Sequence, residues 1–396
     1  MSTEPLSAQQ RRIDEAVAAA QAATTDGMSA GERYGVLYDH GLAWVNFPAG
    51  DGGLGVSTSL REYAAQQVAA AGLETPPRGS NTIGFGMAGP TIVAYGTTEQ
   101  KKILRDIYTL DTIFCQLFSE PGAGSDLAAV ATRAVAEGDV YKVSGQKVWT
   151  SGAQNADMAI LVARTDTSVP KHQGLSYFLI DMHAPGVEVR GLRQITGEAE
   201  FNEVFLTDVE VPAANMLGEP GQGWKVANTT LNNERVAIGG GSPREGGMIG
   251  VVAQAWRDHP EYRDPLLQDR LLELWVEVEV ARMMGERLSQ KLAAGQPGPE
   301  GSGAKLSFAL NNQELSSLDI TMRGVDGLRY DTYEMRRPSE YSMTGRIPGY
   351  RYLRAKGNSI EGGTSEIIRN IISERVLGLP GEHRVDKDVA FKDLPK

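Results

Sequence analysis

Helical spacing of apolar residues dominates the first part of the chain. Alanine-rich stretches at 16–23 and 63–71 favour helices, and a turn-rich segment at 48–53 interrupts them. Thr97 stands before Glu99 and Gln100, an arrangement that suits the N-terminus of a further helix. The pattern predicts a helical region over residues 1–112.

Short β-rich runs replace the helical pattern after about residue 113. Tyr141 and Val143 alternate with polar neighbours, and residues 158–162 form a continuous apolar run. Further valines and leucines follow between Gly and Pro turns. Pro212 ends the run because proline has no N–H for a sheet ladder. We therefore predict a sheet or small barrel over residues 113–221.

Helical spacing returns from about residue 223, so we predict a third, helical domain over residues 222–396. One long helix shows a stripe that faces a core, and a second helix ends at Gly378 with Pro380 beyond. Helices on both sides of a β-domain, without alternating βαβ units, favour an α+β protein over a Rossmann fold. The first stripe consists of Leu271, Leu274, Trp275, Val278, Ala281 and Met284, and the second of Ile367, Ile368, Ile371 and Ile372.

Length and charge narrow the class of protein. A chain of 396 residues can form two or three domains, and 41% hydrophobic with 22% charged residues is ordinary for a globular enzyme. The net charge of −11 gives no general attraction to nucleic acid or anionic membranes, and we expect neither as a partner. Since no secretory signal or membrane-spanning run is visible, a cytoplasmic location is expected.

Cysteine and histidine usage gives no sign of a metal or disulfide framework. The single Cys115 fits a reducing compartment, and its apolar neighbours favour a packing role over a nucleophilic one. The histidines show no metal-binding spacing, so no metal site is expected. They are His40, His172, His183, His259 and His383.

A glycine-rich segment at 119–126 is the first candidate for chemistry. It contains Gly-x-Gly, but Leu127 occupies the third glycine position of a dinucleotide fingerprint and no βαβ unit frames it. Two interpretations stay open. The segment is either a tight turn leading into the sheet, or a turn whose N–H groups and hydroxyls, from Ser119 and Ser125, approach an anionic or carbonyl-rich ring.

Trp149, Thr150 and Ser151 form the second candidate. They stand at the end of a predicted strand and combine an aromatic plane with two hydroxyls, which suits one face of a flat heterocycle. The alternative is that Trp149 belongs to the core.

The motifs FSEPGAGSD at 118–126 and GQKVWTS at 145–151 resemble the acyl-CoA dehydrogenase family. The resemblance implies a helical N-terminal domain, a middle β-barrel-like domain and a C-terminal four-helix bundle, in agreement with the order predicted above. It is strongest between residues 95 and 240 and covers nearly the whole chain. Further matching segments lie at 95–101, 174–180, 209–212, 221–224 and 362–367.

The resemblance implies FAD as cofactor. The 116–125 and 149–151 segments would line the flavin ring, with Ser125 also near the CoA part of the substrate. Residues 364–366, at a helix start whose N–H groups favour phosphate, would touch the phosphates or adenosine. The implied cofactor residues are Gln116, Phe118, Ser119, Gly124, Ser125, Trp149, Thr150, Ser151, Thr364 and Glu366.

The implied reaction needs a carboxylate to remove the α-proton of an acyl-CoA while hydride passes to flavin N5. The family's usual position for this base holds Gly362 here. Glu361 and Glu234 are the candidates, and we favour Glu234, because some members carry the base at this helix position and a one-residue shift turns a side chain elsewhere. Arg235 and Asn232 would then face the substrate. Alternatively, Glu234 and Arg235 form a solvated ion pair.

Two departures from the family concern assembly. The Arg-x-x-Phe-Gly segment that reaches a neighbouring subunit's FAD is missing at 262–268, and the loop at 321–327 is altered. Actinobacterial members that form mixed oligomers are similar in this. The resemblance implies a homo- or hetero-oligomer, dimer or tetramer, with an electron-transfer flavoprotein as next carrier. A flavin monooxygenase or oxidase of the same fold, and a partner subunit of a mixed oligomer, are the alternatives.

Overall fold

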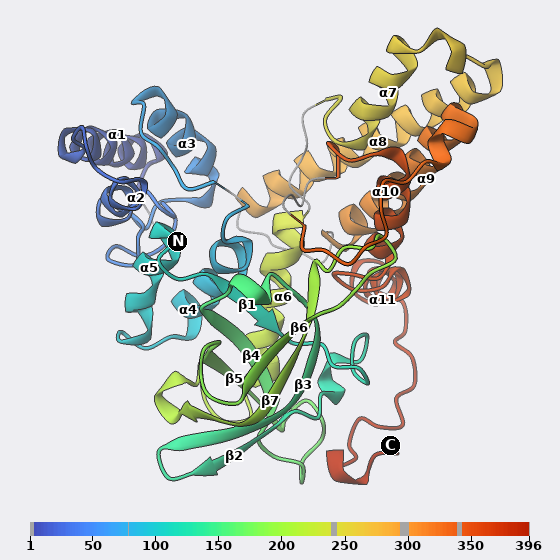
Figure 1. The fold of residues 1–396 in the computed structure, drawn as a ribbon. Helices are drawn as coiled ribbons and strands as arrows, with labels where there is room; N and C mark the ends of the chain where they lie inside the picture. Colours follow the sequence, from blue (N-terminus) through green and yellow to red (C-terminus); the bar gives the residue numbers. More distant parts are fainter. Residues whose placement is uncertain (1–3, 78, 239–243, 294–300, 339–342, 396) are drawn as a thin grey trace.

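The computed structural model describes residues 4–77, 79–238, 244–293, 301–338 and 343–395. Helices from the first part of the chain lie on one side, a curled sheet occupies the centre, and a second group of helices lies on the other side (Figure 1). The last residues leave this second group and run back to the sheet. The predicted α, β, α order is confirmed, and the domain boundaries after residues 112 and 221 stay a prediction.

The N-terminal helices begin at residues that satisfy their free N–H groups. Ser29 and Glu32 form a capping box at the start of α2. The predicted start near Thr97 is similar: the Thr97 N–H donates to Gln100 Oε1 at 2.8 Å, and the Gln100 N–H donates to Thr97 Oγ1 at 3.2 Å. A 3-10 turn then leads into α5. These helices are α1 (Leu6–Ala23), α2 (Ala30–Asp39), α3 (Arg61–Ala70), α4 (Gly89–Tyr95) and α5 (Ile103–Thr109).

The sheet has the order β1-β4-β2-β3-β7-β6, with β5 paired to β4. Most neighbours are antiparallel, and β1 with β4 is the main parallel pair, so the sheet contains no βαβ series. The final strand ends at Pro212, as predicted. The strands are β1 (Phe114–Leu117), β2 (Arg133–Glu137), β3 (Val140–Ser151), β4 (Met158–Arg164), β5 (Leu175–Asp181), β6 (Val187–Gly191) and β7 (Phe201–Pro212).

Strand β4 is buried on both faces, which explains its unbroken apolar run. Ile160 and Val162 pack in the core shared with the N-terminal helices, whereas Ala159 and Leu161 pack inside the sheet's own curl. Cys115 lies in this second core with no exposed surface, and burial raises the pKa of its thiol. Its predicted packing role fits this position.

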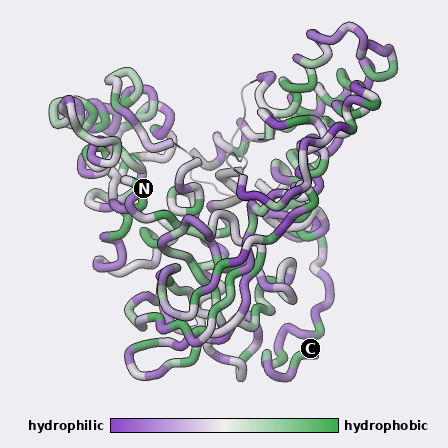
Figure 2. Tube along the Cα trace, in the orientation of Figure 1, coloured by the Kyte–Doolittle hydropathy of each residue, from purple (hydrophilic) through white to green (hydrophobic). Residues whose placement is uncertain are grey.

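The C-terminal helices show apolar and polar positions interleaved along their length (Figure 2). Leu271 and Leu274 on α8 are buried against α7 and α9, as predicted. The expected stripe is wrong at Met284, whose side chain is 42% exposed, because α8 has 29 residues and the packed α7 has only 11. The helices are α6 (Gly223–Ile238), α7 (Met248–Asp258), α8 (Pro265–Ala293), α9 (Gly301–Arg323), α10 (Pro348–Ala355) and α11 (Ser365–Ile371).

Candidate functional site

The glycine-rich segment follows β1 directly and forms a tight turn. Glu120 and Ala123 exchange two backbone hydrogen bonds of 3.0 Å each. Gly122 and Gly124 have no atom within 4 Å of the place where a Cβ would stand, and Ser125 is exposed. The two interpretations of the sequence are therefore compatible, since this is a tight turn whose outer side is open to a ligand.

A buried ion pair supports the turn from beneath. Lys147 of β3 has no exposed surface, and its Nζ donates to Phe118 O at 3.0 Å, Glu120 Oε1 at 2.8 Å and Val162 O at 2.8 Å. All three donors of the ammonium group are thus satisfied. Burial lowers the pKa of Lys147 to about 8, although the Glu120 carboxylate acts in the opposite direction.

Glu120 is held in its charged form by this arrangement. Burial alone would raise its pKa, but Lys147 and the hydrogen bonds from residues 131 and 132 hold the pKa below its usual value. The sequence motif included Lys147 and Glu120 without revealing their roles. The available signal was a lysine in a strand next to the buried Val148.

Trp149 does not lie in the core, which was one of the two positions that the sequence left open. Its side chain is 57% exposed, and its backbone φ is 63°, in the left-handed region. The pairing of β3 with β7 shifts register between Lys147 and Thr150, so a bulge presents the indole outward. The ring contacts Phe201 only by its edge, with centroids 5.9 Å apart. A bulky residue with positive φ is an outlier of the kind found at functional sites.

Two polar atoms beside Trp149 are buried without a partner among the described residues. These are Thr150 Oγ1 and Asn202 Oδ1. The Asn202 amide nitrogen donates to Thr150 O at 2.9 Å, which fixes the two residues relative to each other. Buried polar groups normally have partners, so an unsatisfied pair next to an exposed indole is suited to the polar edge of a flat ligand.

The turn and Trp149 lie next to each other. The Val148 N–H donates to Ser119 O at 2.9 Å, directly beside the bulge. Gln116 lies on β1, and Phe118 is buried with its ring edge-on to Tyr177, 5.8 Å between centroids. The structure thus brings together the expected cofactor residues between 116 and 151.

A cluster of buried hydroxyls joins this site to helix α6. Thr230 Oγ1 lies 2.9 Å from the hydroxyl oxygens of both Tyr177 and Thr91, and all three residues are fully buried. They come from α6, β5 and α4, so three parts of the molecule meet here. Glu234 follows one helical turn beyond Thr230 on α6.

The predicted base and its neighbours can be placed only in part. Glu234 and Arg235 lie in α6 by their backbone, and their side chains lie outside the described residues. Asn232, also on α6, is exposed.

Glu361, the other candidate base, is held in an ion-pair network. Its carboxylate accepts two hydrogen bonds from Arg354, at 3.2 and 3.0 Å, and one from Asn358 at 2.5 Å. Arg354 also pairs with Glu200 at 3.0 Å. The following residues, Gly362 and Gly363, have φ values of 64° and 96°. A carboxylate side chain at 362 would therefore require a backbone conformation that L-residues rarely adopt.

Thr364 and Glu366 lie apart from the turn and Trp149. Thr364 caps α11 and accepts a hydrogen bond from the Ile367 N–H at 3.2 Å, while Glu366 is exposed near Arg369. Within the described ranges, no hydrogen bond joins residues 364–366 to the residues between 116 and 151. In the 262–268 stretch, where the Arg-x-x-Phe-Gly segment is missing, Arg263 donates to two backbone carbonyls at the end of α7, Trp256 O and Arg257 O.

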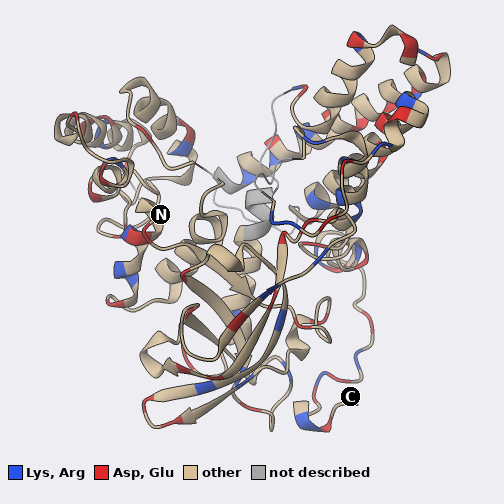
Figure 3. Ribbon diagram, viewed as in Figure 1, with Lys and Arg blue, Asp and Glu red and all other residues tan. Residues whose placement is uncertain are grey.

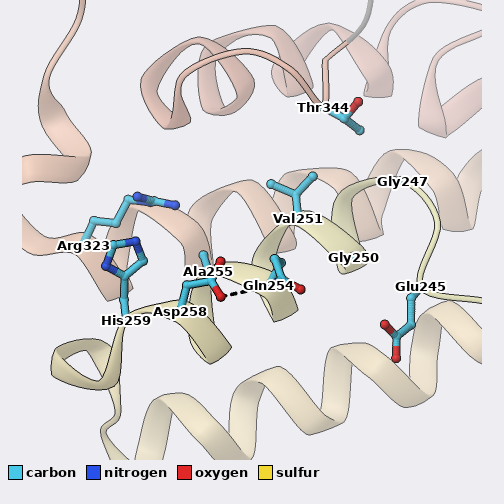
Figure 4. Close-up of a pocket in the computed structure, with 10 residues that line it drawn as sticks. All are labelled: Glu245, Gly247, Gly250, Val251, Gln254, Ala255, Asp258, His259, Arg323 and Thr344. Atoms are coloured by element: carbon cyan, nitrogen blue, oxygen red, sulfur yellow. Dashed lines mark hydrogen bonds between the residues drawn. The ribbon is translucent and has the colours of Figure 1, made fainter.

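A groove of about 550 Å³ lies elsewhere, along α7 (Figure 4). It contains none of the predicted site residues. The groove is lined by Glu245, Gly247, Gly250, Val251, Gln254, Ala255, Asp258, His259, Arg323 and Thr344.

The part of the chain that the structure describes has no group of three metal-ligating side chains, and no helix there is long and apolar enough to cross a membrane.

Comparisons with known proteins identify the family of this chain. The sequence matches the family models described as "Acyl-CoA dehydrogenase, middle domain" over residues 115–209 and "Acyl-CoA dehydrogenase, C-terminal domain" over residues 221–377. It is 37% identical over 344 residues to acyl-CoA dehydrogenase IpdE1 of Mycobacterium tuberculosis, with 86% of each chain covered.

Two solved structures resemble the whole fold. One is the "Tcur3481-Tcur3483 steroid ACAD", with a TM-score of 0.70 and 26% identity, covering 96% of this chain and 100% of that one. The other is the ChsE4-ChsE5 complex of Mycobacterium tuberculosis, with a TM-score of 0.69, 26% identity and the same coverage. Together with the family matches, they show that the chain belongs to the acyl-CoA dehydrogenase family, whose members are oxidoreductases that act on acyl-CoA.

Proposed function

We propose that this protein catalyses FAD-dependent α,β-dehydrogenation of an acyl-CoA thioester to the trans-2-enoyl-CoA. The observation that carries the proposal is Trp149, exposed on a bulge with positive φ beside the unpartnered Thr150 hydroxyl. FAD, when bound, supplies the acceptor for the hydride from the β-carbon. The chain's own residues bind the cofactor, orient the thioester and remove the α-proton.

The residues present fit a flavin. The Trp149 indole offers a plane, Thr150 and Ser151 offer hydroxyls, and the open side of the turn offers Ser119, Ser125 and the backbone near Gly124. Gln116 lies on β1, and Phe118 directly follows this strand. The assignment of Thr364 and Glu366 to the cofactor's phosphates or adenosine stays a prediction.

Glu234 is the proposed base, with Arg235 and Asn232 toward the substrate. Support comes from the other candidate: Glu361 accepts hydrogen bonds from both Arg354 and Asn358, so its charge is paired and three of its four lone-pair sites are occupied. A base must be able to accept a proton from the substrate, and such pairing opposes this. The Thr230 cluster supports Glu234 because it fixes α6 one turn earlier.

Assembly with a second chain is also proposed. The exposed face of α8 carries apolar side chains at intervals of about one turn, Leu272, Val276, Val280 and Met283, with exposures of 56%, 61%, 46% and 52%. Both similar solved structures named above pair two different proteins. We propose a homo- or hetero-oligomer with this face at the interface, and an electron-transfer flavoprotein in the cytoplasm as the electron acceptor.

One experiment tests the reaction directly. The purified chain, alone and co-expressed with a candidate second subunit, is mixed anaerobically with butyryl-CoA, octanoyl-CoA or a steroid side-chain CoA thioester. We expect a yellow protein whose flavin absorbance is bleached by at least one of these substrates. Oxygen consumption by the reduced protein would instead indicate an oxidase or monooxygenase.

The base is tested by comparing two matched variants under the same conditions. Glu234→Gln should retain FAD but lose bleaching, because the isosteric amide cannot take the α-proton. Glu361→Gln should still bleach. The reverse result would assign the base to Glu361, and a colourless wild-type protein in both preparations would contradict the cofactor assignment.

A further inference from the structure

The end of the chain is docked on the central sheet. Residues 386–394 leave the helical bundle and reach the loop after β4, beside the label C in Figure 1. The Phe391 N–H donates to Val169 O at 2.9 Å, the Lys392 N–H donates to Thr167 O at 3.0 Å, and Ala390 pairs with Pro170. These contacts make a short antiparallel pairing between the tail and residues 167–170.

The Phe391 side chain covers a buried arginine. Arg164, at the end of β4, is 3% exposed, and its guanidinium donates to Val130 O at 3.0 Å, Ala128 O at 2.6 Å and Lys171 O at 2.9 Å. The Phe391 ring lies over the same guanidinium, 3.6 Å from centroid to Cζ. A cation–π contact of this kind is strengthened where water is excluded.

A second buried cation links the tail to the glycine-rich turn. The Lys171 side chain is 5% exposed and pairs with Asp126 at 2.5 Å on one side and with Asp386 on the other. Asp126 is the last residue of the 119–126 turn, and Ala128 and Val130 lie within the next four residues. Figure 3 shows charged residues of both signs along the tail.

We propose that residues 386–391 act as a clasp that positions the 119–126 turn for its ligand, with Arg164, Lys171, Asp386 and Phe391 as positioning residues. Lys147 holds the turn at Glu120, Lys171 holds its last residue, Asp126, and Arg164 holds the residues that follow, through Ala128 O. The tail completes both of the latter contacts. This inference rests on the proposed function only in naming FAD as the ligand of the turn.

Two substitutions separate the clasp from general packing. Phe391→Leu keeps apolar bulk but removes the π face over Arg164, and Asp386→Asn removes the charge that faces Lys171. Each should weaken FAD binding about tenfold, as expected for losing one desolvated charge contact. Phe391→Tyr restores the ring and should restore affinity. Lys392→Ala is the matched control, because its side chain is exposed and its backbone contact remains.

The measurement is FAD titration of the flavin-depleted full chain by flavin fluorescence, with visible circular dichroism of the bound flavin as a second signal. Wild-type affinity in both Phe391→Leu and Asp386→Asn would overturn the clasp. A loss of affinity that Phe391→Tyr does not rescue would also overturn it, because the ring would then not be the relevant feature.

Hydrogen exchange of the flavin-free chain gives a readout that does not depend on FAD. The Ala129 and Val130 N–H groups bond to Asp126 O and Leu127 O, in the short 3-10 turn that directly follows the 119–126 turn. They should exchange faster in Phe391→Leu than in wild type, while amides of α2 stay unchanged. Unchanged exchange at 129–130 would contradict the clasp. Faster exchange in a chain that binds no FAD would retain the clasp and reject the cofactor.

Discussion

At the scale of single residues, Trp149 combines an unfavourable backbone with an exposed ring. A positive φ in a non-glycine residue destabilises the fold by about 1 kcal/mol or more. We expect Trp149→Gly to raise the free energy of unfolding of the flavin-free chain by about 1 kcal/mol and to weaken FAD binding strongly. Urea unfolding and flavin titration measure the two effects. Trp149→Phe, which keeps an aromatic plane, is the control and should bind FAD better than Trp149→Gly.

The Lys147–Glu120 ion pair differs from a surface ion pair because both side chains are buried. Lys147→Met leaves the Glu120 carboxylate without its cation, so we expect a loss of about 3–5 kcal/mol in the free energy of unfolding. The double variant Lys147→Met, Glu120→Gln should recover part of this loss, since no uncompensated charge remains. Urea unfolding of the four proteins of this cycle gives the coupling, and additive losses would contradict it.

The same pair predicts that the free energy of unfolding falls at acid pH. The pKa of Glu120 is lowered in the folded state, so its contribution is present above about pH 4.5, the ordinary value, and is lost as the pH falls through the lower folded value. Glu120→Gln should therefore flatten the dependence of unfolding free energy on pH below about 4.5. Glu219→Gln, at an exposed position, is the control and should leave the wild-type slope unchanged.

At the scale of elements, helix α6 depends on one buried hydroxyl. Thr230→Val removes the hydroxyl that lies 2.9 Å from those of both Tyr177 and Thr91, and we expect a loss of about 1–3 kcal/mol in stability together with a lower kcat. Adding Tyr177→Phe should restore stability. Thr229→Val is the comparison on the same helix, because Thr229 is only partly buried and its hydroxyl lies 3.0 Å from the Tyr95 hydroxyl and not in the Thr230 cluster. Thermal unfolding and anaerobic flavin reduction measure both effects, and a wild-type kcat in Thr230→Val would contradict the positioning of α6.

Much of the secondary structure was predictable from local sequence patterns. The helix start at Thr97, the strand end at Pro212 and the tight turn at 119–126 each depend on residues a few positions apart. The bulge at Trp149 was not predictable, because it arises from the register between β3 and β7. The partners of Lys147 and Thr230 were missed for the same reason: they lie in other elements, and periodicity reports only which face of an element is apolar.

At the scale of the whole molecule, the apolar face of α8 predicts association. Val276→Glu places a charge at a 61% exposed position, so we expect smaller particles by mass photometry, with helix content by circular dichroism unchanged. Glu277→Gln, also exposed on α8, is the control. An unchanged particle mass in Val276→Glu would place the interface elsewhere.

The docked C-terminus has a consequence for how the protein is made. Residues 386–391 are synthesised well after the strands of the central sheet, yet they complete the contacts of Arg164 and Lys171 there. Domains generally fold in order as the chain emerges. The sheet can therefore form early in translation, but the turn that it carries reaches its final order only after residues 386–391 have been synthesised. We expect a stop codon before residue 386 to yield a chain whose sheet forms but whose 119–126 turn never completes this step.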